Sequence, residues 1–161
     1  MEREPVFSVT TPHIYVDADA CPVKSEVFRV AARHGLDVTL VAAAWMRVPK
    51  DPSVRLEVVA PGFDAADDWI VQQVQPGDIV ITGDIPLASR SLAKGAAAIG
   101  SDGRPFTEDN IGDAMATRAL LADLRGAGET IAGPPPLTPR ARSQFLQALE
   151  QAVQASLRKG L

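Results

Sequence analysis

Aspartates are the residues of this chain whose spacing points most directly to chemistry, because five of them form three groups along the sequence. The groups are Asp17 with Asp19, Asp67 with Asp68, and Asp84 alone. The first and third groups follow apolar stretches typical of β-strands, and the second lies in the first turn of a predicted helix. Because the carboxyl ends of parallel strands meet at one edge of a sheet, we expect these carboxylates to converge on one crevice.

Clustered carboxylates repel one another unless a cation lies among them, and hard oxygen ligands favour Mg²⁺ or Mn²⁺ over zinc. We therefore predict a Mg²⁺ or Mn²⁺ site whose ligands are Asp17, Asp67, Asp68 and Asp84. A metal in such a site orients a phosphate, lowers the pKa of its bound water and stabilises the leaving oxygen. The predicted catalytic residues are Asp17, Asp19 and Asp84, with Asp19 binding or orienting the attacking water.

Cationic and hydroxyl side chains near these groups are candidates for binding the phosphates of a substrate. They are Lys24, Arg47, Thr82, Ser89, Arg90 and Lys94. Each has a structural alternative, since cations also cover solvated helix faces and hydroxyls also cap helices. The acids have one as well: acidic residues stabilise the first turn of a helix, and we expect Asp64 to be the N-cap of its helix.

The two tryptophans and the single cysteine are the remaining residues that could take part in binding or catalysis. Trp69 lies within an amphipathic helix and is expected in the core, whereas Trp45 precedes Arg47 and is expected at a rim, where an aromatic ring can stack on a base. Cys21 is predicted to pack as a small residue beneath the acidic loop. A thiol at a helix N-terminus can act as a nucleophile, but no histidine is evidently placed to activate this one.

The elements that would position these residues alternate between strands and helices. Strands are predicted at 13–16, 37–44, 55–60, 78–84 and 96–99, with a turn at 101–103; helices are predicted at 23–35, from 64 to about 75, and at 86–94, 108–125 and 140–159. The rhythm predicts a three-layer α/β fold with a mostly parallel central sheet, helices on both faces and an additional C-terminal helix.

Length and composition are compatible with one such domain. We expect a flexible leader over 1–12, the α/β domain over 13–126, a Gly/Pro-rich loop over 127–137, and a C-terminal helix over 138–161 that packs on the domain or forms a homodimer. The net charge of −4 argues against a protein that mainly coats nucleic acid. One cysteine, no long apolar run and no signal-peptide pattern predict a cytoplasmic location with no membrane partner.

Three stretches of the sequence resemble motifs of the bacterial YaiI/YqxD family of uncharacterised proteins. They are Asp-Ala-Asp-Ala-Cys-Pro-Val-Lys at 17–24, Gly-Phe-Asp-Ala-Ala-Asp-Asp-Trp-Ile at 62–70, and Gly-Asp-Ile-Val-Ile-Thr-Gly-Asp-Ile-Pro-Leu-Ala at 77–88. The resemblance implies a fold similar to PIN-like nuclease domains, in which acidic residues at strand ends bind divalent metal and cleave RNA or DNA. By motif position, Asp17 matches the first acid, Asp67 or Asp68 the middle one, and Asp84 the third.

Two other functions fit the same residues. The Asp17-x-Asp19 pair also resembles the first motif of haloacid-dehalogenase-like phosphatases, but Cys21 stands where Thr or Val usually follows, and Ala88 where a second acid is expected. A non-catalytic module that binds a nucleotide or RNA through the metal is the third hypothesis. The acidic net charge suits that module better than it suits tight general RNA binding.

Overall fold

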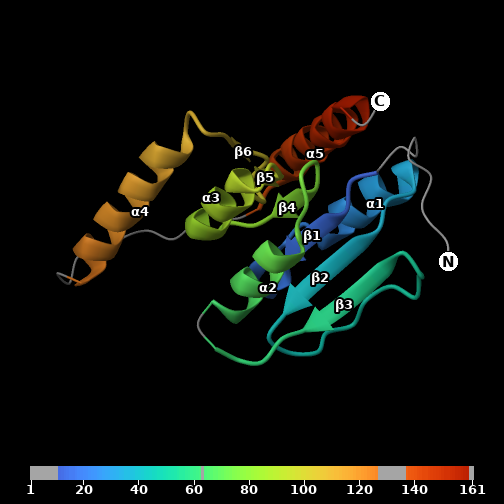
Figure 1. The fold of residues 1–161 in the computed structure, drawn as a ribbon, viewed down its shortest axis with the longest axis horizontal. Helices are drawn as coiled ribbons and strands as arrows, with labels where there is room; N and C mark the ends of the chain where they lie inside the picture. Colours follow the sequence, from blue (N-terminus) through green and yellow to red (C-terminus); the bar gives the residue numbers. More distant parts are fainter. Residues whose placement is uncertain (1–10, 63, 127–136, 160–161) are drawn as a thin grey trace, which may run out of the picture.

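The structure, a computed structural model, describes residues 11–62, 64–126 and 137–159 (Figure 1). Its strands are β1 (Ile14–Asp17), β2 (Val38–Ala42), β3 (Val54–Val58), β4 (Ile79–Ile81), β5 (Ala97–Ile99) and β6 (Pro105–Phe106). Its helices are α1 (Lys24–His34), α2 (Ala65–Gln73), α3 (Ile85–Ala93), α4 (Ile111–Gly126) and α5 (Pro139–Lys159), with a 3₁₀ turn at Ala18–Ala20. The leader and the Gly/Pro-rich loop that we expect fall almost wholly outside the described residues.

The strands form a single six-stranded sheet in the order β3-β2-β1-β4-β5-β6. All neighbouring strands run parallel except β6, which is antiparallel to β5. The chain therefore starts in the middle of the sheet, adds β2 and β3 on one side, and then adds β4 and β5 on the other. This order creates a switch point between β1 and β4, and ligands of open α/β sheets bind at the carboxyl ends of the strands beside such a point.

The central strands are apolar because both of their faces are covered. Every residue of β2 and β4 is buried, and so is every residue of β1 except Asp17 at its end. The edge strand β3 is only half-buried and carries alternating polar residues. Continuous apolar runs in the centre and alternation at the edge are the patterns that parallel sheets with two covered faces require.

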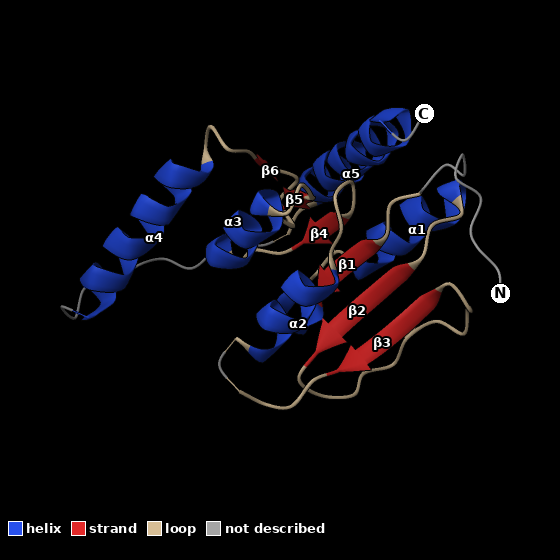
Figure 2. Cartoon of the chain, viewed as in Figure 1, coloured by secondary structure: helices blue, strands red, loops and turns tan. Residues whose placement is uncertain are grey.

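Helices cover both faces of the sheet, as Figure 2 shows. One face packs against α1 and α5 through a core that includes Val27, Val30, Phe145, Leu149 and Val153. The opposite face packs against α2 and α3 through Ile70, Val74 and Leu87. The predicted three-layer α/β fold with a mostly parallel sheet is therefore confirmed.

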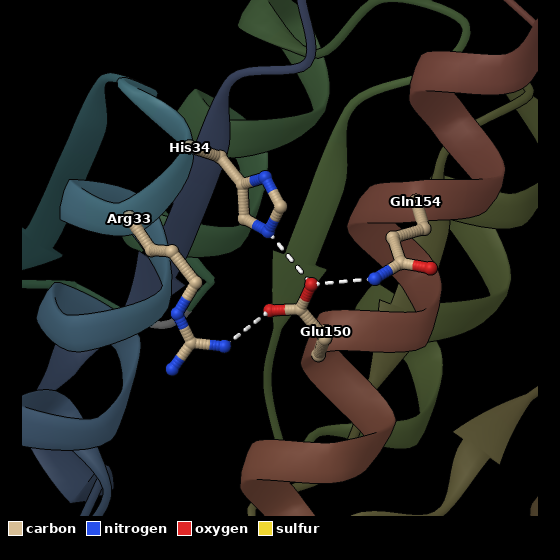
Figure 3. A network of polar contacts seen from close by, with 4 residues as sticks. All are labelled: Arg33, His34, Glu150 and Gln154. Carbon is tan, nitrogen blue, oxygen red and sulfur yellow. Dashed lines mark hydrogen bonds and ion pairs between the residues drawn. The ribbon is translucent and has the colours of Figure 1, made fainter.

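The C-terminal helix α5 lies on the domain, beside α1 and β5. Its Glu150 joins the two helices through a polar network (Figure 3). One carboxylate oxygen accepts a hydrogen bond from Arg33 at 2.9 Å, and the other lies 2.8 Å from His34 Nε2 and accepts from Gln154 at 2.7 Å. Apolar packing and this network together hold α5 against the sheet.

The structure differs from the predicted elements at several boundaries and adds a 3₁₀ turn and a sixth strand. Helix α1 begins at Lys24 because Val23 has non-helical backbone angles (φ −114°, ψ 28°). A 3₁₀ turn follows β1 and brings the chain out of the sheet. Strand β6 forms a hairpin with β5 around the predicted turn, in which Gly103 takes a φ of +86° that favours glycine.

Helix α4 extends to one side of the molecule, next to α3 (Figure 1). Among the described residues, no helix has an apolar stretch long enough to cross a membrane.

Candidate functional site

A pocket of about 370 Å³ opens at the carboxyl ends of the strands, where the sequence predicts the site. Five carboxylates line it: Asp17, Asp19, Asp64, Asp67 and Asp84. They come from the end of β1, from the start of α2 and from the start of α3. The sheet order brings the ends of β1 and β4 together at the switch point, so residues that lie 67 positions apart face one pocket.

Thr82 links the two acids that flank the switch point. Its hydroxyl donates a hydrogen bond to Asp17 Oδ2 at 2.9 Å and accepts one from the backbone N–H of Asp84 at 2.9 Å. Asp84 in turn is the N-cap of α3, because its Oδ1 accepts from the N–H of Leu87 at 3.0 Å. The hydroxyl therefore orients the carboxylate of Asp17 and fixes the backbone at Asp84, and its predicted contact with a phosphate stays a prediction.

Asp19 is anchored to the neighbouring strand. Both of its carboxylate oxygens lie within hydrogen-bond distance of the backbone N–H of Ala43, at 3.1 and 3.3 Å. Ala43 directly follows β2 and lines the pocket itself. Asp19 remains exposed, so its carboxylate faces solvent at the mouth of the site.

The electrostatics of the pocket are dominated by burial and by repulsion among the acids. Burial, reinforced by the negative charges of Asp84, Asp17 and Asp64, raises the pKa of Asp67 to about 6. Burial also raises the pKa of Asp17, with Asp84 and Asp19 adding to the rise and the Thr82 hydrogen bond opposing it. A carboxylate pocket that resists ionisation in this way favours the binding of a cation.

The structure brings together four of the predicted acids and separates the fifth. Asp17, Asp19, Asp67 and Asp84 share the pocket, whereas Asp68 is exposed and forms an ion pair with Arg90 at 2.9 Å. Helical geometry explains the difference, because consecutive helix positions point about 100° apart. The middle acid of the pocket is therefore Asp67.

The predicted phosphate-binding cations are mostly engaged elsewhere. Arg90 is paired with Asp68, Lys94 Nζ donates to the carbonyl of Val71 at 2.7 Å, and Lys24 Nζ donates to the carbonyl of Cys21 at 2.8 Å. Those two lysines thus stabilise loop and helix ends. Arg47 is exposed in the segment that follows β2, and Ser89 is half-buried within α3.

The donor set of the pocket consists of carboxylate oxygens, which suits a hard divalent cation. Within the described ranges, no three acidic, histidine or cysteine side chains are grouped closely enough to hold one ion by themselves. This arrangement still fits Mg²⁺, which commonly binds through one or two carboxylates and keeps several waters. Thr82 connects two of the acids that line the pocket, through the carboxylate of Asp17 and the backbone of Asp84.

Two features of the pocket were not predicted from the sequence. Asp64 lines it, and its carboxylate contributes to the raised pKa of Asp67. Asp64 is the N-cap residue of α2, as predicted, but its side chain forms no capping hydrogen bond and the residue adopts a left-handed φ of 65°. The second feature is the backbone anchor at Ala43. The position of Asp64 three residues before Asp67 is the sequence signal that could have placed Asp64 at the pocket.

Cys21 is buried beside the acidic loop, as predicted. Burial raises the pKa of its thiol, with the N–H of Val23 opposing the rise. The thiol therefore stays protonated at neutral pH and has little nucleophilic character.

Comparison with known proteins identifies a family. The family described as "Uncharacterized BCR, YaiI/YqxD family" matches residues 15–155. A UPF0178 protein of Rhodopseudomonas palustris strain BisB18 is 55% identical over 140 residues, which is 87% of this chain and 90% of the relative. A UPF0178 protein of Parvibaculum lavamentivorans is 56% identical over 146 residues, covering 91% and 96% of the two chains. No solved structure matches significantly.

Proposed function

This chain belongs to the YaiI/YqxD family, and we propose that it is a divalent-metal-dependent nuclease that hydrolyses phosphodiesters of RNA or DNA. The observation that carries the proposal is the convergence of Asp17, Asp67 and Asp84 in one pocket at the switch point of the sheet. The parallel order β3-β2-β1-β4-β5, with acids at the strand ends, also supports the PIN-like fold that the motifs imply.

In this proposal, Asp17 and Asp84 hold a Mg²⁺ or Mn²⁺ ion, and Asp67 binds it or a second ion. The metal, when bound, supplies charge stabilisation to the phosphate and a more acidic water. Thr82 keeps Asp17 and Asp84 in place through its two hydrogen bonds. Asp19 faces solvent at the mouth and orients the attacking water, since its carboxylate is fixed by Ala43 and still accessible.

The raised pKa of Asp67 gives the pocket a second property. At a pH near 6 this carboxyl is shared between its protonated and ionised forms, and a bound cation would favour the ionised form. Metal binding is therefore expected to release protons and to strengthen as the pH rises from 5 to 7. Titration calorimetry in buffers with different ionisation enthalpies measures that proton release.

The test combines metal binding with turnover. Labelled single-stranded and structured RNA and DNA are incubated with Mg²⁺ or Mn²⁺ and the wild-type protein, or with the double variant Asp17→Asn, Asp84→Asn purified in the same way. We expect metal-dependent cleavage that falls at least about 100-fold in the double variant, because two metal ligands lose their charge. The thermal shift produced by the metal is expected to disappear with it.

Asp68→Asn is the matched control. It makes the same chemical change one residue from Asp67, but on the side of α2 that faces Arg90. This variant is expected to retain cleavage and metal binding. Equal cleavage by the wild type and the double variant would point to a contaminating nuclease. A folded wild type that binds metal and cleaves none of the substrates would contradict the proposal.

A further inference from the structure

Trp45 has the largest exposed fraction, 75%, among the large apolar side chains of the described residues. The other tryptophan, Trp69, is half-buried and packs edge-on against Tyr15, with ring centroids 6.3 Å apart. An indole ring left in water forgoes the largest apolar burial that any side chain offers. An exposed indole ring at this position is therefore a candidate contact for a ligand.

The segment that carries Trp45 has an alternating pattern. Met46 and Val48 are half-buried and pack against the core beneath α1 and α5, whereas Trp45 and Arg47 are exposed. Inward and outward alternation with period two is the geometry of an extended chain, although no strand is formed here. Two apolar anchors thus hold the segment on the domain and leave an aromatic ring and a guanidinium exposed to solvent.

Trp45 lies close to the acidic pocket in the sequence, and Arg47 follows two residues later on the same segment. The segment leaves β2 at Ala42, and Ala43 both lines the pocket and donates its N–H to Asp19. Trp45 is two residues further along, so its Cα lies within about 7 Å of that of Ala43. Arg47 forms no ion pair with any residue in the described part of the chain.

We propose that Trp45 and Arg47 form the substrate-binding platform of the pocket, on which an unpaired base stacks and the adjacent phosphate is bound. The inference rests on the proposed function and adds the substrate class: single-stranded nucleic acid. Alternate residues of an extended chain lie about 6.6 Å apart, so the two side chains can contact the same strand. Bases in a duplex are already stacked and cannot offer a free face to the ring.

The platform also supplies what the pocket lacks. The pocket is lined by acids, and several of the cations first considered for phosphate binding contact other groups. Arg47 supplies an exposed cation that forms no ion pair with the acids of the described residues. Binding then divides between a ring for the base, a guanidinium for one phosphate and the metal pocket for the scissile phosphate.

The first experiment compares Trp45→Ala with the wild type on a single-stranded oligonucleotide and on the same strand with abasic sites flanking the cleavage position. We expect the variant to lose about 5- to 150-fold in kcat/KM on the base-containing strand, mainly through KM, and almost nothing on the abasic strand. Trp45→Phe should recover most of the loss. Leu120→Ala, which truncates an exposed side chain on α4, is the control and should not change either substrate.

The second experiment does not depend on turnover. In a Trp69→Phe variant, Trp45 is the remaining tryptophan and reports on its own environment. With Ca²⁺ replacing Mg²⁺, adding the base-containing strand is expected to quench its fluorescence saturably, whereas the abasic strand and a duplex should quench it little. Arg47→Ala should shift the quenching curve to higher strand concentration and reduce its salt dependence.

The outcomes separate the two proposals. Equal activity of Trp45→Ala and the wild type on both strands, in a protein that cleaves, would overturn the platform and leave the nuclease standing. Base-dependent quenching in a protein that cleaves nothing would support the platform and overturn the nuclease. Absence of both cleavage and quenching, in a folded and metal-bound protein, would overturn both.

Discussion

Two aspartates are buried almost equally at opposite ends of the sheet, yet their surroundings differ. Asp78, at the amino end of β4, is 6% exposed, and its two oxygens accept hydrogen bonds from the backbone N–H groups of His13 and Gln75 at 3.0 and 2.9 Å. Asp67, at the carboxyl end, is 9% exposed and lies among other carboxylates. Among the described residues, no group donates a hydrogen bond to it.

The difference contrasts a carboxylate whose charge the fold matches with donors and a carboxylate that lies among like charges. At the amino end, the charge of Asp78 is matched by backbone donors that the fold itself supplies. The neighbouring His13 ring stacks on Tyr15, and its Nε2 lies 2.7 Å from Thr39 Oγ1. At the carboxyl end, like charges are held together with donors for only some of them. An unmatched charge costs stability, and such a cost is typical of sites arranged for a ligand rather than for the fold.

The largest stability effect is expected from Asp78→Ala. This change leaves two partly buried backbone N–H groups without their acceptors, and each unsatisfied group costs on the order of 1 kcal/mol or more. We expect the free energy of unfolding to fall by about 2 to 3 kcal/mol, measured by urea denaturation at pH 7. A loss below about 0.5 kcal/mol would show that solvent reaches these donors and would weaken the contrast between the two ends.

Asp67→Asn is expected to act in the opposite direction. The pKa of Asp67 is about 6 in the folded protein, above its ordinary value of 3.8. Between these two values the folded state binds more protons than the unfolded state, so the stability of the protein falls as the pH rises through that range. Removing the charge should stabilise the metal-free protein by about 1 to 2 kcal/mol at pH 7.5, a discounted value because the pocket is open to solvent. No gain is expected at pH 4.

Measuring the unfolding of this variant and of the wild type between pH 4 and pH 8 tests whether Asp67→Asn stabilises the protein. The gain should grow as the pH rises from about 4 to about 6 and should come with weaker metal binding, since the same carboxylate is a proposed ligand. Destabilisation at pH 7.5 would show that Asp67 has partners in solution that offset the repulsion.

The smallest effect is expected from Glu150→Gln, which changes a carboxylate on the surface between α1 and α5. Hydrogen bonds from Gln154 and His34, with the charge of Arg33, lower the pKa of Glu150, so its contribution to stability is present above its ordinary pKa of 4.5 and is lost as the pH falls below it. We expect a loss of less than about 1 kcal/mol at pH 7, none at pH 3, and a smaller loss at high salt. Thermal unfolding at the two pH values measures it.

Much of this organisation could be predicted from the sequence. Apolar runs ending in Asp17 and Asp84 identified the strands and the end of the sheet that carries the site, and the apolar stripe with Phe145 identified the C-terminal helix. The alternation of strands and helices along the chain was sufficient to predict the three-layer fold. Period and turn chemistry are local properties, so they can be recognised without knowing which segments meet.

The remaining features required the tertiary structure. Sequence pattern made Asp67 and Asp68 equivalent, and only the packing of α2 directs one into the pocket and the other toward Arg90. It also offered Arg90 and Lys94 as phosphate ligands, whereas long-range contacts engage both of them.

What the sequence by itself determined is which residues carry charge, which segments are strands and helices, and at which end of the strands the acids lie. The tertiary structure decided which charges are neighbours, because the sheet order places β4 beside β1 and brings Thr82 between Asp17 and Asp84. Burial and repulsion act over a few ångströms in space. The pKa of Asp67 is therefore a property of the folded arrangement, which no spacing along the chain contains.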